Sequence, residues 1–131
     1  MKCEAMDLGV CGVEQVLCAG AVKFDTKDAD KGIVLAELPE NIIITKAVAV
    51  VNKAFNAATT NVITVGTNDA ANDLLGSSDV TAGTANSYAK NVFKIFKGKK
   101  TAIKVKFSQT GAKATTGEAD IYLNVVRIPG D

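Results

Sequence analysis

Side chains that usually carry out chemistry are scarce in this chain, which contains neither histidine nor tryptophan. Histidine is the commonest general base and the usual partner of a Ser or Cys nucleophile, so Ser-His-Asp and Cys-His mechanisms are excluded. A pair of carboxylates could still hydrolyse glycosides. Candidates for such a pair are Asp69, Asp73, Asp79, Glu118 and Asp120. The first three lie in a Gly/Ser/Asn-rich stretch typical of turns, and we therefore expect no enzyme activity.

Metal and cofactor sites are also not expected. Cys3, Cys11 and Cys18 are eight and seven residues apart, and no fourth thiolate or histidine completes a tetrahedral zinc site. Their odd number argues against a closed disulfide framework and fits a reducing cytosol. We expect three free thiols that act as small apolar residues, with contacts between subunits as the alternative.

A short acidic segment between residues 25 and 30 is the other candidate for a metal. Asp25, Asp28 and Asp30 could offer oxygen ligands to calcium, but their offsets match no known calcium loop. Lys27 and Lys31 lie among them. A solvated charged turn is the favoured interpretation, and no cofactor is predicted.

Charge is distributed unevenly along the chain. The formal net charge is only +1, yet Val80 to Gly117 contains eight lysines and no Asp or Glu. The rest of the chain holds seven cations and fourteen anions, so the surface should be dipolar. The candidate partner-binding residues are Lys94, Lys97, Lys99, Lys100, Lys104 and Lys106.

Three interpretations of this lysine cluster remain. It could be a solvated face, a contact for an acidic protein or the acidic half of a sister subunit, or a nucleic-acid surface. Nucleic acid is disfavoured because the chain's one arginine, Arg127, lies outside the cluster. The aromatic residues Tyr88, Phe93, Phe96 and Phe107 are expected in the core and not on a stacking platform. No apolar run approaches the roughly 18 residues of a spanning helix, so no membrane contact is predicted.

The elements that must position these residues are predicted to be strands. They should belong to one domain, since 131 residues suffice for a single core. Ile33–Leu38 should be a strand that ends at Pro39, because proline cannot donate to a ladder. Ile42–Lys53 is apolar on both faces, which predicts a central strand covered on each side. Val62–Gly66 then resumes the chain after a hairpin or a sandwich corner.

The C-terminal third has two further strand patterns. Ile103, Val105 and Phe107 alternate with lysines, and a last strand runs through Ile121, Leu123 and Val125. We expect these two strands to pair as an antiparallel hairpin.

The segment from 85 to 96 is ambiguous. Tyr88, Val92 and Phe96 recur at helical spacing, so one short helix is possible there. Extended structure is slightly favoured because the neighbouring segments are β. The fold class predicted is all-β, an antiparallel β-sandwich or jelly roll. Residues 1–32 would form an N-terminal arm and charged turn, and residues 33–131 the β-sandwich domain.

Four segments resemble a family of small structural proteins of tailed bacteriophages and prophages. They are LPENIIITKA from Leu38, AFNAATTNVITVGT from Ala54, DVTAGT from Asp79 and ADIYL from Ala119. The resemblance covers roughly Ile33 to Pro129 and leaves the cysteine-bearing N-terminus outside.

The resemblance implies a virion component that is assembled in the host cytoplasm. Its first implication is a capsid decoration or auxiliary head protein, bound to the major capsid protein or other virion proteins. A homo-oligomer, with a trimer favoured, goes with that role. The alternatives are a tail or neck component and a carbohydrate-binding adhesin module. The adhesin is weakened because only Tyr88 and Tyr122 could offer a sugar platform.

Overall fold

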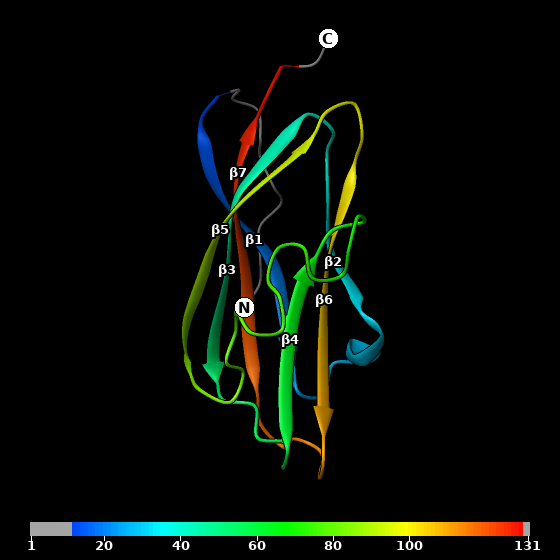
Figure 1. Ribbon diagram of the computed structural model, residues 1–131, viewed down its shortest axis with the longest axis vertical. Coiled ribbons are helices and arrows are strands. Elements are labelled where there is room, and N and C mark those ends of the chain that lie inside the picture. Colours follow the sequence, from blue (N-terminus) through cyan, green and yellow to red (C-terminus); the bar gives the residue numbers. More distant parts are fainter. Residues whose placement is uncertain (1–11, 130–131) are drawn as a thin grey trace.

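Two antiparallel β-sheets pack face to face in the computed structural model, which describes residues 12–129 (Figure 1). The elements in chain order are β1 (Glu14–Lys23), η1 (Ala29–Lys31), β2 (Ile33–Leu38), β3 (Ile42–Lys53), β4 (Thr60–Gly66), β5 (Asn86–Phe96), β6 (Thr101–Thr110) and β7 (Glu118–Arg127). η1 is a single 3-10 turn, and no α-helix occurs in the described residues. The predicted β-sandwich is confirmed.

The sheets contain four and three strands. Sheet A has the order β1-β7-β3-β5 and sheet B the order β2-β6-β4, with every neighbouring pair antiparallel. β1 and β5 are therefore the edges of sheet A. No helix in the span 12–129 is long and apolar enough to cross a membrane.

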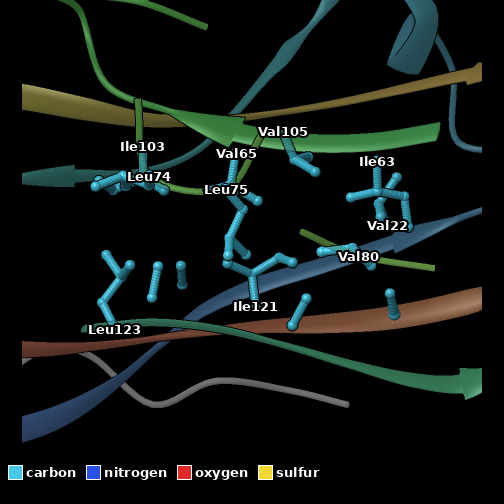
Figure 2. Packing of buried hydrophobic residues seen from close by; sticks show 14 of the residues in the cluster. Val22, Ile63, Val65, Leu74, Leu75, Val80, Ile103, Val105, Ile121 and Leu123 are labelled. Carbon is cyan, nitrogen blue, oxygen red and sulfur yellow. The ribbon is translucent and has the colours of Figure 1, made fainter. Parts of the chain in front are cut away.

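Alternating side chains fill the space between the sheets. In β7, Ile121, Leu123 and Val125 are fully buried, and in β6 Ile103 and Val105 face them from the other layer (Figure 2). Because side chains alternate across a strand, the residues between these positions must point outward. The core is mainly aliphatic, and Phe55, Phe96 and Phe107 are also buried in it.

The strand predictions for the first half of the sandwich are confirmed. β2 and β3 have the predicted bounds, and Pro39 follows β2 directly. β3 and β4 lie in opposite sheets, so the connection between them is a sandwich corner. The outward face of β3 is only half-buried, and the predicted cover on both sides is therefore incomplete.

The ambiguous segment 85–96 is extended. β5 pairs with β3 along its length, with a register shift between Ile44 and Lys46. The possible helix is wrong, and the slightly favoured extended structure is confirmed. Tertiary pairing with β3 outweighs the helical spacing of the apolar residues.

The predicted C-terminal hairpin is wrong. β6 pairs with β2 and β4, whereas β7 pairs with β1 and β3 in the other sheet. The loop between β6 and β7 therefore crosses from one layer to the other. Period-2 alternation identifies a strand but carries no information on its partner.

The predicted division between residues 1–32 and 33–131 does not match the sheets. Glu14–Lys23 is an integral edge strand, β1, paired with β7, and Leu17 and Val22 belong to the core. The arm is thus corrected to a strand over this span. Small and polar residues obscured its alternation in the sequence, and a bulge between Cys18 and Gly20 interrupts it.

Cys18 is disulfide-bonded in this structure, which corrects the expectation that all three cysteines are free thiols. An odd count excludes complete pairing but not one bridge. Cys3 and Cys11 lie outside the described residues.

Close packing at the start of β7 requires a glycine. The rings of Phe55 and Phe107 lie 4.6 Å apart between centroids, tilted by 46°. Gly117 has a φ of +147°, and a Cβ added there would overlap the Phe55 ring. Gly98 also has a positive φ, +72°, but open space surrounds its missing Cβ.

We predict that Gly117→Ala lowers the free energy of unfolding by about 3 kcal/mol, because backbone strain adds to overpacking. Gly98→Ala, which has only the strain, should lower it by about 1 kcal/mol. Urea unfolding monitored by circular dichroism measures both variants. Equal losses would show that the Phe55 contact does not constrain this position.

Candidate interaction site

The structure divides the six lysines predicted to bind a partner into separate places. Lys94 lies in β5, Lys97, Lys99 and Lys100 lie in or beside the β5–β6 turn, and the other two lie in β6. They therefore lie in both sheets and in the turn that joins β5 to β6.

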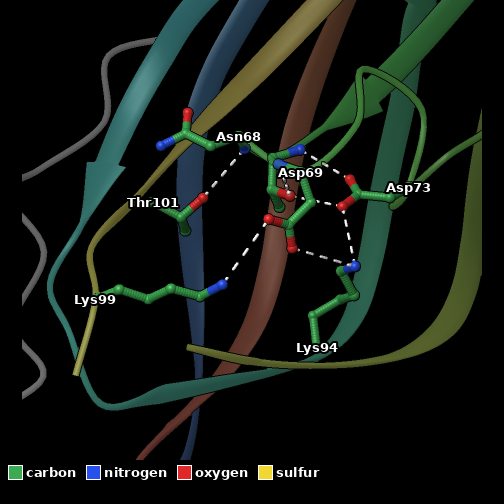
Figure 3. Close-up of polar contacts among 7 residues, drawn as sticks. Asn68, Asp69, Asp73, Lys94, Lys99 and Thr101 are labelled. Atoms are coloured by element: carbon green, nitrogen blue, oxygen red, sulfur yellow. Dashed lines mark hydrogen bonds and ion pairs between the residues drawn. The ribbon is translucent and has the colours of Figure 1, made fainter. Parts of the chain in front are cut away.

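Lys94 and Lys99 are engaged within the molecule (Figure 3). The Lys94 ammonium lies 3.2 Å from an Asp73 carboxylate oxygen and 3.5 Å from an Asp69 oxygen. Lys99 lies 3.9 Å from Asp69, and its ammonium is 5.5 Å from the centroid of the Phe96 ring. Both lysines thus hold the loop that follows β4 and are less available to a partner.

Asp73 is the centre of this network. Its carboxylate accepts hydrogen bonds from the Thr67 backbone N–H at 2.8 Å and the Thr67 hydroxyl at 2.6 Å. The Asn68 N–H donates to the Thr101 hydroxyl at 3.2 Å, and both threonines are almost fully buried. The hydrogen bond that the Lys94 ammonium donates to the Asp73 carboxylate raises the pKa of Lys94. This stabilisation is present below the unfolded-state pKa of the lysine and is lost as pH rises through the folded-state pKa.

A second ion pair fixes the end of the same loop. Lys90 lies 3.1 Å from Asp79, whose carboxylate also accepts the Gly76 N–H at 2.7 Å. The Gly76 hydrogen bond, followed by that from Lys90, lowers the pKa of Asp79. The resulting stabilisation is present above the unfolded-state pKa and is lost as pH falls through the folded-state value. The loop carboxylates proposed as catalytic candidates therefore have structural partners.

The remaining carboxylate candidates lie in β7. Glu118 lies 3.8 Å from Lys23, and Asp120 is buried and accepts a hydrogen bond from the Asn52 amide at 2.7 Å. Burial, and then the charge of Asp120, raises the pKa of Tyr122. No group of three metal-ligating side chains occurs in the part of the chain that the structure describes.

Lys104 and Lys106 are arranged differently. Both point outward from the middle strand of sheet B, and no carboxylate within residues 12–129 lies at ion-pair distance from either. They line a cleft of about 380 Å³ together with Lys31, Gly32, Val34 and Ala71. This cleft is called the sheet B cleft below.

An exposed apolar edge was missed in the sequence. Phe93 is 69% exposed, which corrects its predicted place in the core, whereas Phe96 and Phe107 are buried as expected. Ile95 is 47% exposed and lies beside Ile43 in the register. The alternation Phe93/Ile95 against Lys94/Phe96 was the available signal, but it does not tell which face is covered.

Two solved structures contain chains with this fold. One is in the cyanophage Pam1 capsid asymmetric unit, with 20% identity, 98% of this chain and 94% of that chain covered, and a TM-score of 0.69. The other is in the acidic stable capsid structure of Helicobacter pylori bacteriophage KHP30, with 16% identity, 89% and 90% covered, and a TM-score of 0.62. At such identities the likeness shows a common fold, and it agrees with the phage resemblance found in the sequence. No protein-family model and no curated protein sequence matches the chain.

We predict that Asp73→Asn lowers the free energy of unfolding by about 1 to 2 kcal/mol, because charge-assisted hydrogen bonds to Thr67 and Lys94 are weakened. Asp69→Asn is the matched control, since its carboxylate is more exposed and its ion pairs are longer. It should cost about 0.5 kcal/mol or less. Urea unfolding at neutral pH compares the two variants. Equal losses would show that Asp73 is not the centre of the network.

Proposed function

We propose that this protein is a structural component of a bacteriophage capsid. The observation that carries the proposal is the fold, which two phage capsid chains share over about nine-tenths or more of each chain. A fold match alone does not fix function, but the sequence resemblance and the surfaces described above agree with it. The protein would reside in the virion.

Within the capsid, the proposed role is that of a decoration or auxiliary head protein that binds the major capsid protein and stabilises the shell. A sandwich with a mainly aliphatic core and ion-paired loops suits this role, because a protein that stabilises the shell must itself keep its shape when the shell is stressed. The role requires binding and not catalysis. The available carboxylates support this view, since their contacts hold loops and strands in place.

The alternative roles receive less support. A carbohydrate-binding module needs exposed aromatic rings, but Tyr88 is half-buried and its hydroxyl donates to the backbone oxygens of Thr81 and Thr84. Tyr122 is also half-buried. A tail or neck component shares the need for stable protein contacts and is separated from a head protein by the particle that it binds.

We predict that the purified protein co-sediments with capsids prepared without it and saturates at a fixed number of copies per shell. Saturated capsids should also lose their contents at a higher temperature, since a ligand that binds only the assembled state stabilises it. Capsids that already carry the protein are the control and should take up no more. Binding to tails or isolated cell-wall glycan in place of capsids would contradict the decoration role.

A homo-oligomer, with a trimer favoured, belongs to the same proposal. The two edges of sheet A both expose apolar side chains, Phe93 and Ile95 on β5 and Val16 on β1. A ring with an odd number of copies needs contacts between two different patches. We therefore place the self-contact between the β5 edge of one copy and the β1 edge of the next.

We predict that Phe93→Ser converts the oligomer into a monomer in size-exclusion chromatography with light scattering, because the exposed ring would lie within the contact. Val34→Ser is the control, since Val34 is 53% exposed but lies on sheet B. It should leave the mass unchanged. A monomeric parent protein, or an unaltered oligomer after Phe93→Ser, would contradict this contact.

A further inference from the structure

Three lysines line the sheet B cleft, and for two of them, Lys104 and Lys106, no carboxylate within residues 12–129 lies at ion-pair distance. In the β-ladder Lys104 lies between Val34 of β2 and Gly66 of β4, and Lys106 lies opposite Thr64. None of these neighbours carries a charge. By contrast, Lys90, Lys94 and Lys99 each have a carboxylate partner.

The cleft has a wall on each side of the two lysines. On one side η1 packs against β6 and contributes Lys31, whose only described ion pair is an exposed contact of 3.8 Å with Asp28. On the other side the loop after β4 contributes Ala71. Gly66 allows this, because a Cβ there would overlap the backbone of residues 70 and 71.

Hydrogen bonds and ion pairs hold in place the loop that forms this wall. Asp73 ties the loop to Thr67 and Lys94, and the Asn68 N–H is tied to Thr101. Asp69 and Asp73 of the loop therefore pair with Lys94 and Lys99, and neither carboxylate lies at ion-pair distance from Lys104 or Lys106. Lys104 and Lys106 have no such carboxylate partner among residues 12–129 and can therefore contact a ligand.

We infer that the sheet B cleft receives an extended, acidic segment of another protein, and under the proposed function the major capsid protein supplies it. Charge complementarity carries this assignment, since three lysines line the cleft and, within residues 12–129, two of them have no carboxylate at ion-pair distance. Lys104 and Lys106 are two residues apart on one strand, about 7 Å. An extended chain with acidic residues at alternate positions presents carboxylates at the same spacing.

A protein segment fits this cleft better than a nucleic acid. Its lining includes Gly32, Val34 and Ala71 but no aromatic ring on which a base could stack and no arginine. Val34 is 53% exposed and could contact the side chains that alternate with the acidic ones.

The test uses the full chain and a labelled peptide of alternating glutamate and serine, with binding followed by fluorescence anisotropy at low salt. The double variant Lys104→Gln/Lys106→Gln should bind about tenfold more weakly. Lys27→Gln/Lys113→Gln removes the same charge outside the cleft and should change affinity less than about twofold. Circular dichroism and urea midpoints confirm that both variants fold. Equal losses in the two double variants would overturn the assignment.

Two further measurements test whether the cleft binds a different ligand. If oligothymidylate binds as tightly as the peptide and loses as much affinity in Lys104→Gln/Lys106→Gln, the cleft binds phosphates and the inference is overturned. If that variant changes the mass measured by light scattering, the occupant is a second copy, and the inference is again overturned.

Capsid co-sedimentation separates this inference from the function on which it rests. If the parent protein and Lys104→Gln/Lys106→Gln bind capsids equally well, the cleft is not the docking site, but the capsid role stands. If the parent protein binds the acidic peptide but no capsids, the capsid role fails and the cleft needs another acidic partner. Loss of capsid binding in this variant alone supports both.

Discussion

Burial of aliphatic side chains between the two sheets is the interaction on which the rest of the structure depends. Ile121 and Leu123 in β7 pack toward Ile103 and Val105 in β6, and each of these four is fully buried. Removal of apolar surface from water is the dominant favourable term in folding. Since β6 and β7 are consecutive in the chain but lie in opposite sheets, the loop between them must cross from one layer to the other.

The charged residues of the sandwich have two different roles. In the loop after β4, Asp73 and Asp79 bind lysines of β5 and accept hydrogen bonds from backbone N–H groups. Their charges therefore stabilise the conformation of the loop. On the outer face of sheet B, Lys104 and Lys106 have uncharged strand neighbours. A structural protein needs both kinds of residue, because docking charges are useful only on a surface whose loops stay in place.

The lysine cluster shows how proximity in sequence differs from proximity in space. Eight lysines without an intervening acid predict one basic face. In the fold they lie in both sheets, in the β5–β6 turn and in the β6–β7 loop, and the acidic residues Asp69, Asp73 and Asp79 neutralise Lys90, Lys94 and Lys99. The candidate site is therefore smaller than the sequence suggested, and it gains Lys31, which lies far from the cluster in the chain.

The sequence by itself determined the all-β class, the bounds of β2 and β3, and the lack of histidine chemistry, because alternation, proline and composition are local properties. Only the tertiary structure decided that β6 and β7 separate, that Glu14–Lys23 joins sheet A, that Phe93 is exposed and that Cys18 is disulfide-bonded. The physical reason is that a strand can pair with any other strand of suitable pattern. The choice depends on which arrangement buries the most apolar surface across the whole chain.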